Sequence, residues 1–329
     1  MPRAEREPSA ARGYGLVAIA AFCWAGGGLI AKWLFTAPGT DTVAWIFQPL
    51  GIEIDPVLLS ASRAMLSAVI TFALLVLWRR ELLVVRVRNL PFLAAFGVFG
   101  LALVHLAYFK TIATTDVATA ILLEYLAPVV VLVVSVAFLG ERLTATLPAA
   151  VVLSVGGCAL MVGAIGGDGI HVSSGGLAWG LGSAVLFAGY MLMGRYAAGR
   201  FAPWTMLFYG LAAASIFWLM VLGGPSPVLA LLSDGRAFLA VLALSVVSTV
   251  VPFAAFLAAL RDIETTKASV TSTLEPVIAG CVAWFAFGEH LTFLQLLGGG
   301  CVVAAIVVSQ VRTHVPPEMP VVREGPWQA

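Results

Sequence analysis

The sequence predicts an all-α integral membrane protein with ten transmembrane helices, arranged as two inverted-topology repeats of five helices each. Composition indicates the class, because 61% of the 329 residues are hydrophobic and 11% are charged, whereas about 25% of residues in a soluble domain are charged. A repeat indicates the architecture: the apolar stretch from Pro128 to GERLT at 140–144 returns from Pro276 to GEHLT at 288–292. A long apolar helix that is written twice indicates two copies of one structural unit.

Ten apolar stretches have the length of a membrane-spanning helix. The first has 22 residues, or roughly 33 Å of helix at about 1.5 Å per residue, which spans a bilayer. It is longer than the apolar region of a cleaved signal peptide, about 7–15 residues. Thr292 and Gln295 are expected to form a capping box that opens the last span. The predicted spans are Tyr14–Phe35, Pro56–Trp78, Pro91–Phe109, Asp116–Leu139, Leu147–Ile165, Gly175–Tyr196, Pro203–Leu222, Ala237–Leu260, Thr265–Phe287 and Phe293–Val311.

The spans divide into two repeats, at residues 14–166 and 175–311, between tails at 1–13 and 312–329. Each repeat has five spans, and an odd number obliges the second repeat to enter the membrane the other way up. Segment Thr36–Asp55 has no counterpart of similar length in the second repeat. This segment is either a lid or a connection without a further role.

The distribution of positive charge predicts the orientation. With the N-terminus inside the cell, most of the 18 Lys and Arg residues fall on the cytoplasmic side, as the positive-inside rule requires. We therefore expect both termini in the cytoplasm. The net charge of +1 favours no nucleic-acid partner. The four cysteines lie in apolar stretches, without the spacing of a disulfide framework or a metal site.

Two carboxylates inside spans are the leading candidates for a substrate-binding site. Glu124 lies in the fourth predicted span and Glu275 in the ninth, and a charge in hydrocarbon costs on the order of a few kcal/mol unless it faces a cavity or a partner. Each is close to a proline, Pro128 or Pro276, which bends the helix and frees backbone carbonyls beside the acid. Such a site can hold a substrate ammonium group or a proton. The alternative is a protonated glutamate that hydrogen-bonds between helices as a packing device.

Arg63 and His105 have two interpretations each. Arg63 in the second span presents a guanidinium that suits a substrate carboxylate, or it is structural and reaches the interface or a neighbouring acid. His105 in the third span is a candidate proton relay, or a histidine whose role is packing. These residues form no metal-ligand pattern, and no cofactor is expected.

Aromatic residues within the spans form a further pool of candidate lining residues. Trp24, Tyr108 and Tyr190 lie well inside their spans rather than in the interfacial belts where Trp and Tyr are common. A cavity that they line would favour aromatic or amphipathic substrates, and core packing is the alternative. Glu141 and Glu289 lie in turns between spans, where we expect each carboxylate to cap the helix that follows.

Other classes of membrane protein are less compatible with the sequence. It contains no GxSxG, HExxH, acid-rich or Walker motif, so neither an enzyme nor an ATP-driven pump is expected. A channel predicts a repeated filter-like loop, which the sequence lacks, and a structural membrane protein gives no reason for an inverted repeat. A flippase for lipids or lipid-linked substrates remains an alternative, because the same architecture can present a lateral cleft.

The ten spans, the inverted repeat, the paired GERLT and GEHLT endings and Arg63 in the second span resemble the drug/metabolite transporter superfamily. The resemblance is specifically to its ten-span members built of two EamA domains, and it covers about residues 13–311. It implies a substrate cavity between the repeats and carriage of metabolites such as amino acids across the inner membrane, often outward.

The expected function is therefore secondary-active transport of small metabolites across the inner membrane by alternating access. We expect an exporter of amino acids or similar amphipathic solutes, with the bilayer and a small-molecule substrate as its partners. Coupling to protons and movement down the substrate's own gradient both stay open, as do a monomer and a homodimer.

Overall fold

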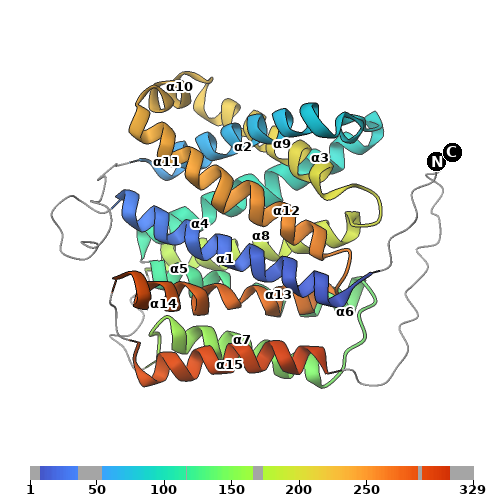
Figure 1. Cartoon of the computed structure of the whole chain (residues 1–329), viewed down its shortest axis with the longest axis vertical. Helices are drawn as coiled ribbons and strands as arrows, with labels where there is room; N and C mark the ends of the chain where they lie inside the picture. The colour runs from blue at the N-terminus through green and yellow to red at the C-terminus, as the bar shows by residue number, and fades with distance from the viewer. Residues whose placement is uncertain (1–7, 36–53, 116, 166–172, 288–290, 312–329) are drawn as a thin grey trace.

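The structure is a computed structural model, which describes residues 8–35, 54–115, 117–165, 173–287 and 291–311. All regular secondary structure in these ranges is helical. Figure 1 shows the helices running roughly side by side, with the beginning of α1 and the end of α15 at the same end of the bundle. We call this the inner end, because the sequence predicts that both termini lie in the cytoplasm.

The helices of the first half lie at the five predicted spans, but several ends differ by a few residues and the fourth span is divided. Pro56 and Pro91 lie in the first turn of their helices, where a missing N–H costs no helical hydrogen bond. The elements are α1 (Ala10–Phe35), α2 (Pro56–Trp78), the 3₁₀ turns η2 (Arg80–Leu83) and η3 (Val87–Asn89), α3 (Leu90–Gly97), the π-helical turn η4 (Val98–Ala102), α4 (Leu103–Thr114), α5 (Val117–Glu124), α6 (Ala127–Phe138) and α7 (Thr146–Met161).

The second half repeats this order of α-helices and π-helical turns, and has one short helix, α10, where the first half has the 3₁₀ turns; the sequence analysis did not predict α10. The expected capping box is confirmed: the Thr292 side chain accepts from the Gln295 backbone, and the Gln295 side chain accepts from the Thr292 backbone. The elements are α8 (Ser174–Ala197), α9 (Pro203–Leu222), α10 (Ser226–Ser233), α11 (Gly235–Ser245), the π-helical turn η5 (Val246–Val250), α12 (Val251–Ala259), α13 (Thr265–Ser272), α14 (Leu274–Phe287) and α15 (Phe293–Gln310).

The length and composition of these helices make the chain a multi-pass membrane protein. Among the described residues, seven helical segments are long and apolar enough to cross a bilayer, and Thr146–Met161 is a shorter apolar helix. The seven are Pro56–Trp78, Val87–Thr114, Thr119–Phe138, Ser174–Ala197, Pro203–Leu222, Gly235–Ala259 and Phe293–Gln310.

Two predicted continuous spans are interrupted, at corresponding positions of the two halves. The fourth span breaks at Tyr125 and Leu126 between α5 and α6, and the ninth breaks at Thr273 between α13 and α14. The π-helical turns also correspond, because η4 lies between α3 and α4 just as η5 lies between α11 and α12. A π-helical turn and a helix break each leave backbone groups outside the regular hydrogen-bond ladder, and both features are common at functional sites.

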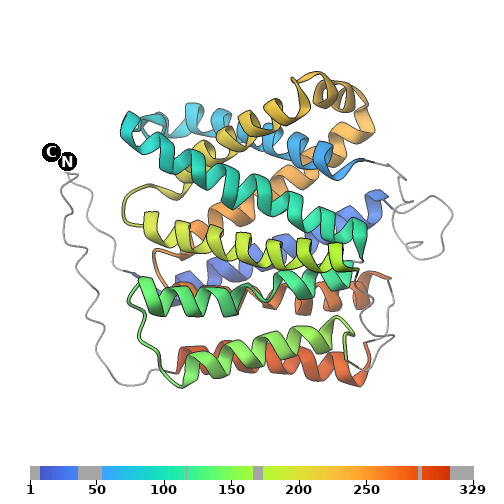
Figure 2. The same cartoon turned by 180° about the vertical axis from the view of Figure 1, so that it is seen from behind.

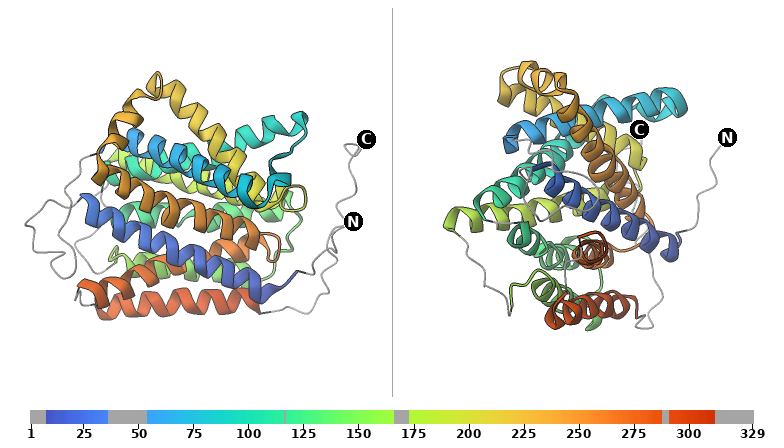
Figure 3. Two further views of the ribbon diagram at one scale, coloured as in Figure 1. Left: turned by 45° about the horizontal axis from the view of Figure 1, so that its top comes forward. Right: turned by 60° about the vertical axis from the view of Figure 1, so that its left-hand side comes forward.

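The most extensive helix contacts among the described residues run between the halves. Helix α1 packs on α12 and α14, α8 packs on α4 and α6, and α2 packs on α9. Figure 2 shows the bundle from behind, and Figure 3 shows α7 and α15 as a pair at one edge. In that pair Gly157 and Gly298 bring the two backbones together, since a Cβ at Gly298 would lie 2.7 Å from the Gly157 carbonyl oxygen.

Candidate functional site

Glu275 lies in the first turn of α14, the second helix of the broken ninth span, and is bound by a residue from the first half of the chain. The Tyr125 hydroxyl donates a hydrogen bond to Glu275 Oε2 at 2.6 Å and lies 3.0 Å from the Ser272 carbonyl oxygen. Tyr125 belongs to the break between α5 and α6, and Ser272 ends α13. The two helix breaks therefore face each other, and Tyr125 joins them.

Glu124 is the last residue of α5, and its carboxylate also binds across the halves. Ser183 Oγ in α8 donates to Glu124 Oε2 at 2.6 Å. Glu124 and Glu275 are close enough for their charges to interact, and Tyr108 in α4 lies within electrostatic range of both. Each glutamate is only partly buried. The structure thus brings together two carboxylates that the sequence separates by more than a hundred residues.

Arg63 lies in α2 and is anchored by the π-helical turn of the other half. Its Nη2 lies 2.9 Å from Ser248 Oγ and 2.9 Å from Thr249 Oγ1. Its guanidinium carbon lies 5.2 Å above the centre of the Phe109 ring, a cation–π distance. The residue is 4% exposed, so the guanidinium is buried inside the protein and does not extend to its surface. Within the part of the chain that the structure describes, it pairs with hydroxyl groups rather than with an acid, and its Nε has no hydrogen-bond partner.

His105 in α4 lies close to Arg63 and packs among aromatic rings. It is within electrostatic range of the guanidinium, its ring is 5.4 Å edge-on from that of Phe253, and it stacks on Phe109 at 6.5 Å. Tyr108 lies within electrostatic range of Arg63 as well as of the two glutamates. Tyr108 is therefore near both the cationic and the acidic parts of the candidate site.

Trp24 and Tyr190 lie in a neighbouring aromatic cluster. Trp24 in α1 contacts Phe187, Phe253 and Phe256, with ring centroids 5.6 to 5.7 Å apart. Tyr190 in α8 is fully buried, and its hydroxyl donates to the Phe253 carbonyl oxygen at 3.2 Å. Trp24 keeps part of its surface accessible. Of the two, Trp24 has the surface that a lining residue needs.

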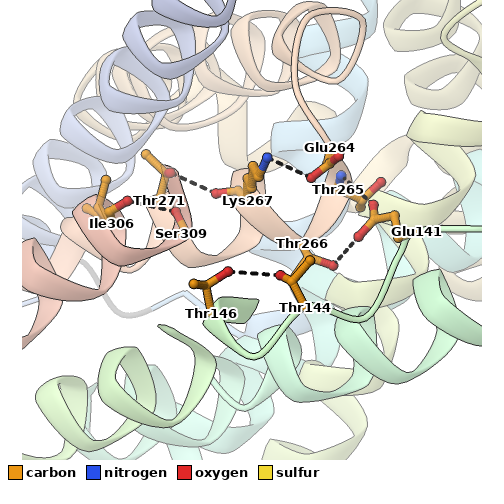
Figure 4. Close-up of polar contacts among 10 residues, drawn as sticks. All are labelled: Glu141, Thr144, Thr146, Glu264, Thr265, Thr266, Lys267, Thr271, Ile306 and Ser309. Carbon is orange, nitrogen blue, oxygen red and sulfur yellow. Dashed lines mark hydrogen bonds and ion pairs between the residues drawn. The ribbon is translucent and has the colours of Figure 1, made fainter. Parts of the chain in front are cut away.

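Glu141 caps a different helix from the expected one. The sequence predicted that it would cap the helix that follows, α7, but α7 begins without a side-chain cap. Glu141 Oε1 instead accepts from the Thr265 backbone N–H at 2.9 Å, and Oε2 accepts from the Thr266 hydroxyl, both in the first turn of α13 (Figure 4). The prediction was wrong because sequence proximity cannot show which helix start lies nearest in space. Glu289 lies outside the described residues.

An apolar cavity of about 340 Å³ lies at the side of the molecule, between α7, α14 and α15. Its walls include Met161, Val277 and Cys281, with Gln295 as a polar contributor. The residues that line this cavity do not include Glu124, Glu275 or the residues that bond to them. This cavity is a separate feature from the candidate site.

Comparison with known proteins identifies the family. The profile of the EamA-like transporter family matches the chain twice, over residues 11–163 and 174–310. The chain belongs to the EamA-like transporter family. The two matches lie close to the two repeats expected from the sequence, and together they cover most of the chain.

Curated relatives of this EamA-family chain are transporters. An uncharacterized transporter of Archaeoglobus fulgidus is 31% identical over 68% of this chain and 76% of its own length. The threonine/homoserine exporter RhtA of Escherichia coli K12 is 29% identical, over 85% of each chain. The pseudopaline exporter CntI of Pseudomonas aeruginosa is 27% identical, over 73% of this chain and 82% of its own. The protein is therefore a membrane transporter rather than an enzyme.

The crystal structure of another protein has a fold similar to that of this EamA-family chain. It covers 92% of this chain and 97% of its own, with a TM-score of 0.71 and 21% sequence identity. At this identity the likeness concerns the fold alone.

Sequence reasoning missed the residues that hold the charged groups of this EamA-family site. Tyr125, Ser183, Ser248 and Thr249 donate or accept hydrogen bonds there. Tyr125 had one available signal, because a tyrosine inside a span next to an intramembrane glutamate needs a polar partner. Small hydroxyl residues are common in membrane helices, and the sequence had no signal that singled out the other three.

Proposed function

We propose that this EamA-family chain is a secondary-active exporter of amino acids or similar amphipathic solutes, and that it works by alternating access. In this proposal ten spans form two inverted repeats, and the substrate binds between them near Glu124, Glu275 and Tyr108. Both termini lie in the cytoplasm, and the membrane is the inner membrane. The relatives that export threonine, homoserine and pseudopaline support the direction and the substrate class.

The observation that carries the proposal is the meeting of the two helix breaks. Transporters with inverted repeats bind substrate where discontinuous helices of the two repeats face each other near the middle of the membrane. Here Tyr125 of one break hydrogen-bonds Glu275 beside the other, and Glu124 ends the helix before its own break. Carboxylates in such a position suit a substrate ammonium group or a coupling proton.

The inverted repeat has further support in the arrangement of helices. The contact of α1 with α12 corresponds to that of α8 with α4, and the contact of α1 with α14 corresponds to that of α8 with α6. The breaks and the π-helical turns recur at matching places in the two halves. A two-fold relation between the halves accounts for all of these correspondences.

The test is efflux from proteoliposomes that contain a mixed amino-acid pool including threonine and homoserine, with and without an imposed pH gradient. We expect saturable efflux of at least one solute, and a loss of at least tenfold in Glu275→Gln and Glu124→Gln. The matched control is Glu81→Gln, which removes a carboxylate paired with Arg79 at the surface. That control is expected to transport normally.

Two outcomes would contradict the proposal. Undiminished flux in both glutamine variants across pH would remove the carboxylates from the mechanism. No flux of any solute, together with transfer of a fluorescent lipid between leaflets, would indicate a flippase instead. The apolar cavity between α7, α14 and α15 is the observation that favours this second function, because it is lined mainly by apolar surface.

A further inference from the structure

Helix α13 is a polar helix inside a membrane protein. Its sequence is TTKASVTS, and all of its residues except Lys267 are buried. Its hydroxyl groups are satisfied mainly within the helix: Ser269 and Ser272 donate to carbonyls three residues earlier, and Thr271 donates to the Lys267 carbonyl. The corresponding helix of the first half, α5, has the mainly apolar sequence VATAILLE. The two halves therefore differ at this place.

This internal bonding leaves α13 with few polar contacts to the rest of the molecule. It ends at the break at Thr273, where the chain is already outside the regular helix. Its beginning is held by Glu141, which accepts from the Thr265 N–H and from the Thr266 hydroxyl (Figure 4). Ser269, Thr271 and Ser272 keep their hydrogen bonds if the helix moves, because these bonds lie within it. From the first half, the Tyr125 hydroxyl holds only the Ser272 carbonyl beside the break, so Glu141 is the polar attachment at the beginning of α13.

The turn before α13 is held from other directions. Arg12 at the start of α1 lies 3.4 Å from the Asp262 carboxylate, and Arg195 in α8 donates to the Leu260 carbonyl oxygen at 2.7 Å. These contacts fix the end of α12 and the turn. They leave α13 attached between this turn and its break, with Glu141 bridging from the loop between α6 and α7.

We propose that α13 is the moving part of a gate at the inner end of the transporter, and that Glu141 is the latch that holds it closed. The proposal rests on the proposed transport function. When the latch opens, α13 pivots about Thr273 and exposes a wall of hydroxyl groups that water can wet. Glu264, which precedes α13, and Lys267 in its first turn form an ion pair at 2.9 Å and are the charged groups beside the latch.

The experiment measures access of water to α13 without any substrate, so it is independent of whether transport is found. Ser269→Cys is introduced into full-length protein in nanodiscs, with the four native cysteines replaced by alanine, and labelled with a membrane-impermeant maleimide. Ser269 is fully buried, one turn into α13. We expect Glu141→Ala to raise the labelling rate at least tenfold. Thr266→Val, which removes one of the two contacts, is expected to give a smaller rise.

Three controls define the result. Glu264→Gln removes a neighbouring carboxylate that pairs with Lys267, and its effect on labelling is expected to be much smaller than that of Glu141→Ala. Ser154→Cys reports on a buried position in α7 and is expected to stay unlabelled in every variant. Amide hydrogen exchange at residues 265–268 reports fraying of the first turn alone.

Faster labelling at Ser269→Cys only would support the gate. Faster amide exchange without faster labelling would overturn it, because Glu141 would then be a local helix cap. Faster labelling at both cysteine positions would also overturn it, because the variant would have loosened the whole bundle. Unchanged labelling and exchange would show that Glu141 holds nothing.

Discussion

Tyr125 is the residue whose removal tests the contact between the two helix breaks most narrowly. In Tyr125→Phe the ring stays and Glu275 loses its hydrogen-bond donor. A hydrogen bond to a charged group contributes about 1.5–3 kcal/mol, so we expect transport to fall about tenfold or more. Proteoliposome flux measures this. Tyr196→Phe, on an exposed ring beside Arg200, is the control, and an equal loss there would contradict the assignment.

Arg63 supports stability through the π-helical turn of the opposite half. Arg63→Gln removes the contacts to Ser248 and Thr249 and leaves both hydroxyl groups without their cationic partner. We expect a loss of about 1–3 kcal/mol in the free energy of unfolding, seen as a lower melting temperature in detergent. Arg79→Gln, at an exposed ion pair, is expected to change it by less than about 1 kcal/mol. Equal stability of the two variants would argue against a structural role for the anchored guanidinium.

At the scale of elements, the α7 and α15 pair depends on close contact of two backbones. A Cβ at Gly298 would lie 2.7 Å from the Gly157 carbonyl oxygen and 2.8 Å from the Met161 nitrogen, whereas one at Gly300 would meet nothing within 4 Å. We expect Gly298→Ala to destabilise the protein by about 1–3 kcal/mol and Gly300→Ala to have little effect. Both positions lie in α15, and thermal unfolding compares the two variants. Equal melting temperatures would contradict the close contact of the two backbones at Gly298.

The positions of the helices were the part of the structure that the sequence predicted best. The bilayer requires long apolar helices, and for this reason Pro56–Trp78 and Pro203–Leu222 were predicted with the bounds that the structure has. The breaks near Tyr125 and Thr273, the π-helical turns and the target of Glu141 depend on which helices meet in space. Local composition carries no information about which helices contact each other. Glu124 and Glu275 were selected because a carboxylate in a span is costly, and their hydrogen-bond donors could not be selected in that way.

For the whole molecule, the latch predicts a dependence of gating on pH. Burial raises the pKa of Glu141 above its ordinary value of 4.5 in the closed structure; the Thr266 hydrogen bond opposes this, and the charge of Glu264 adds a smaller increase. An open gate would return the carboxyl to water and to its ordinary pKa. The closed gate therefore binds the proton more tightly. Protonation of Glu141 stabilises closure fully below the ordinary pKa, and this stabilisation is lost as pH rises through the raised pKa.

Labelling of Ser269→Cys across pH measures this dependence, with each rate normalised to that of denatured protein at the same pH. We expect the rate to rise with pH through the raised pKa. Glu141→Gln resembles the protonated state, so its rate is expected to be low and independent of pH. The opposite slope, or an equal slope in both proteins, would contradict the assignment.

The pairing of distant helices also shapes how the protein is made. Arg63 finds Ser248 185 residues later in the chain, and at roughly 5–20 residues per second the ribosome takes roughly 10–40 s to deliver that partner. During this interval the guanidinium lacks both of the hydroxyl groups, those of Ser248 and Thr249, that it bonds to in the finished protein. The first half synthesised alone is accordingly expected to be degraded quickly in pulse-chase experiments, and co-expression of residues 173–329 is expected to rescue it.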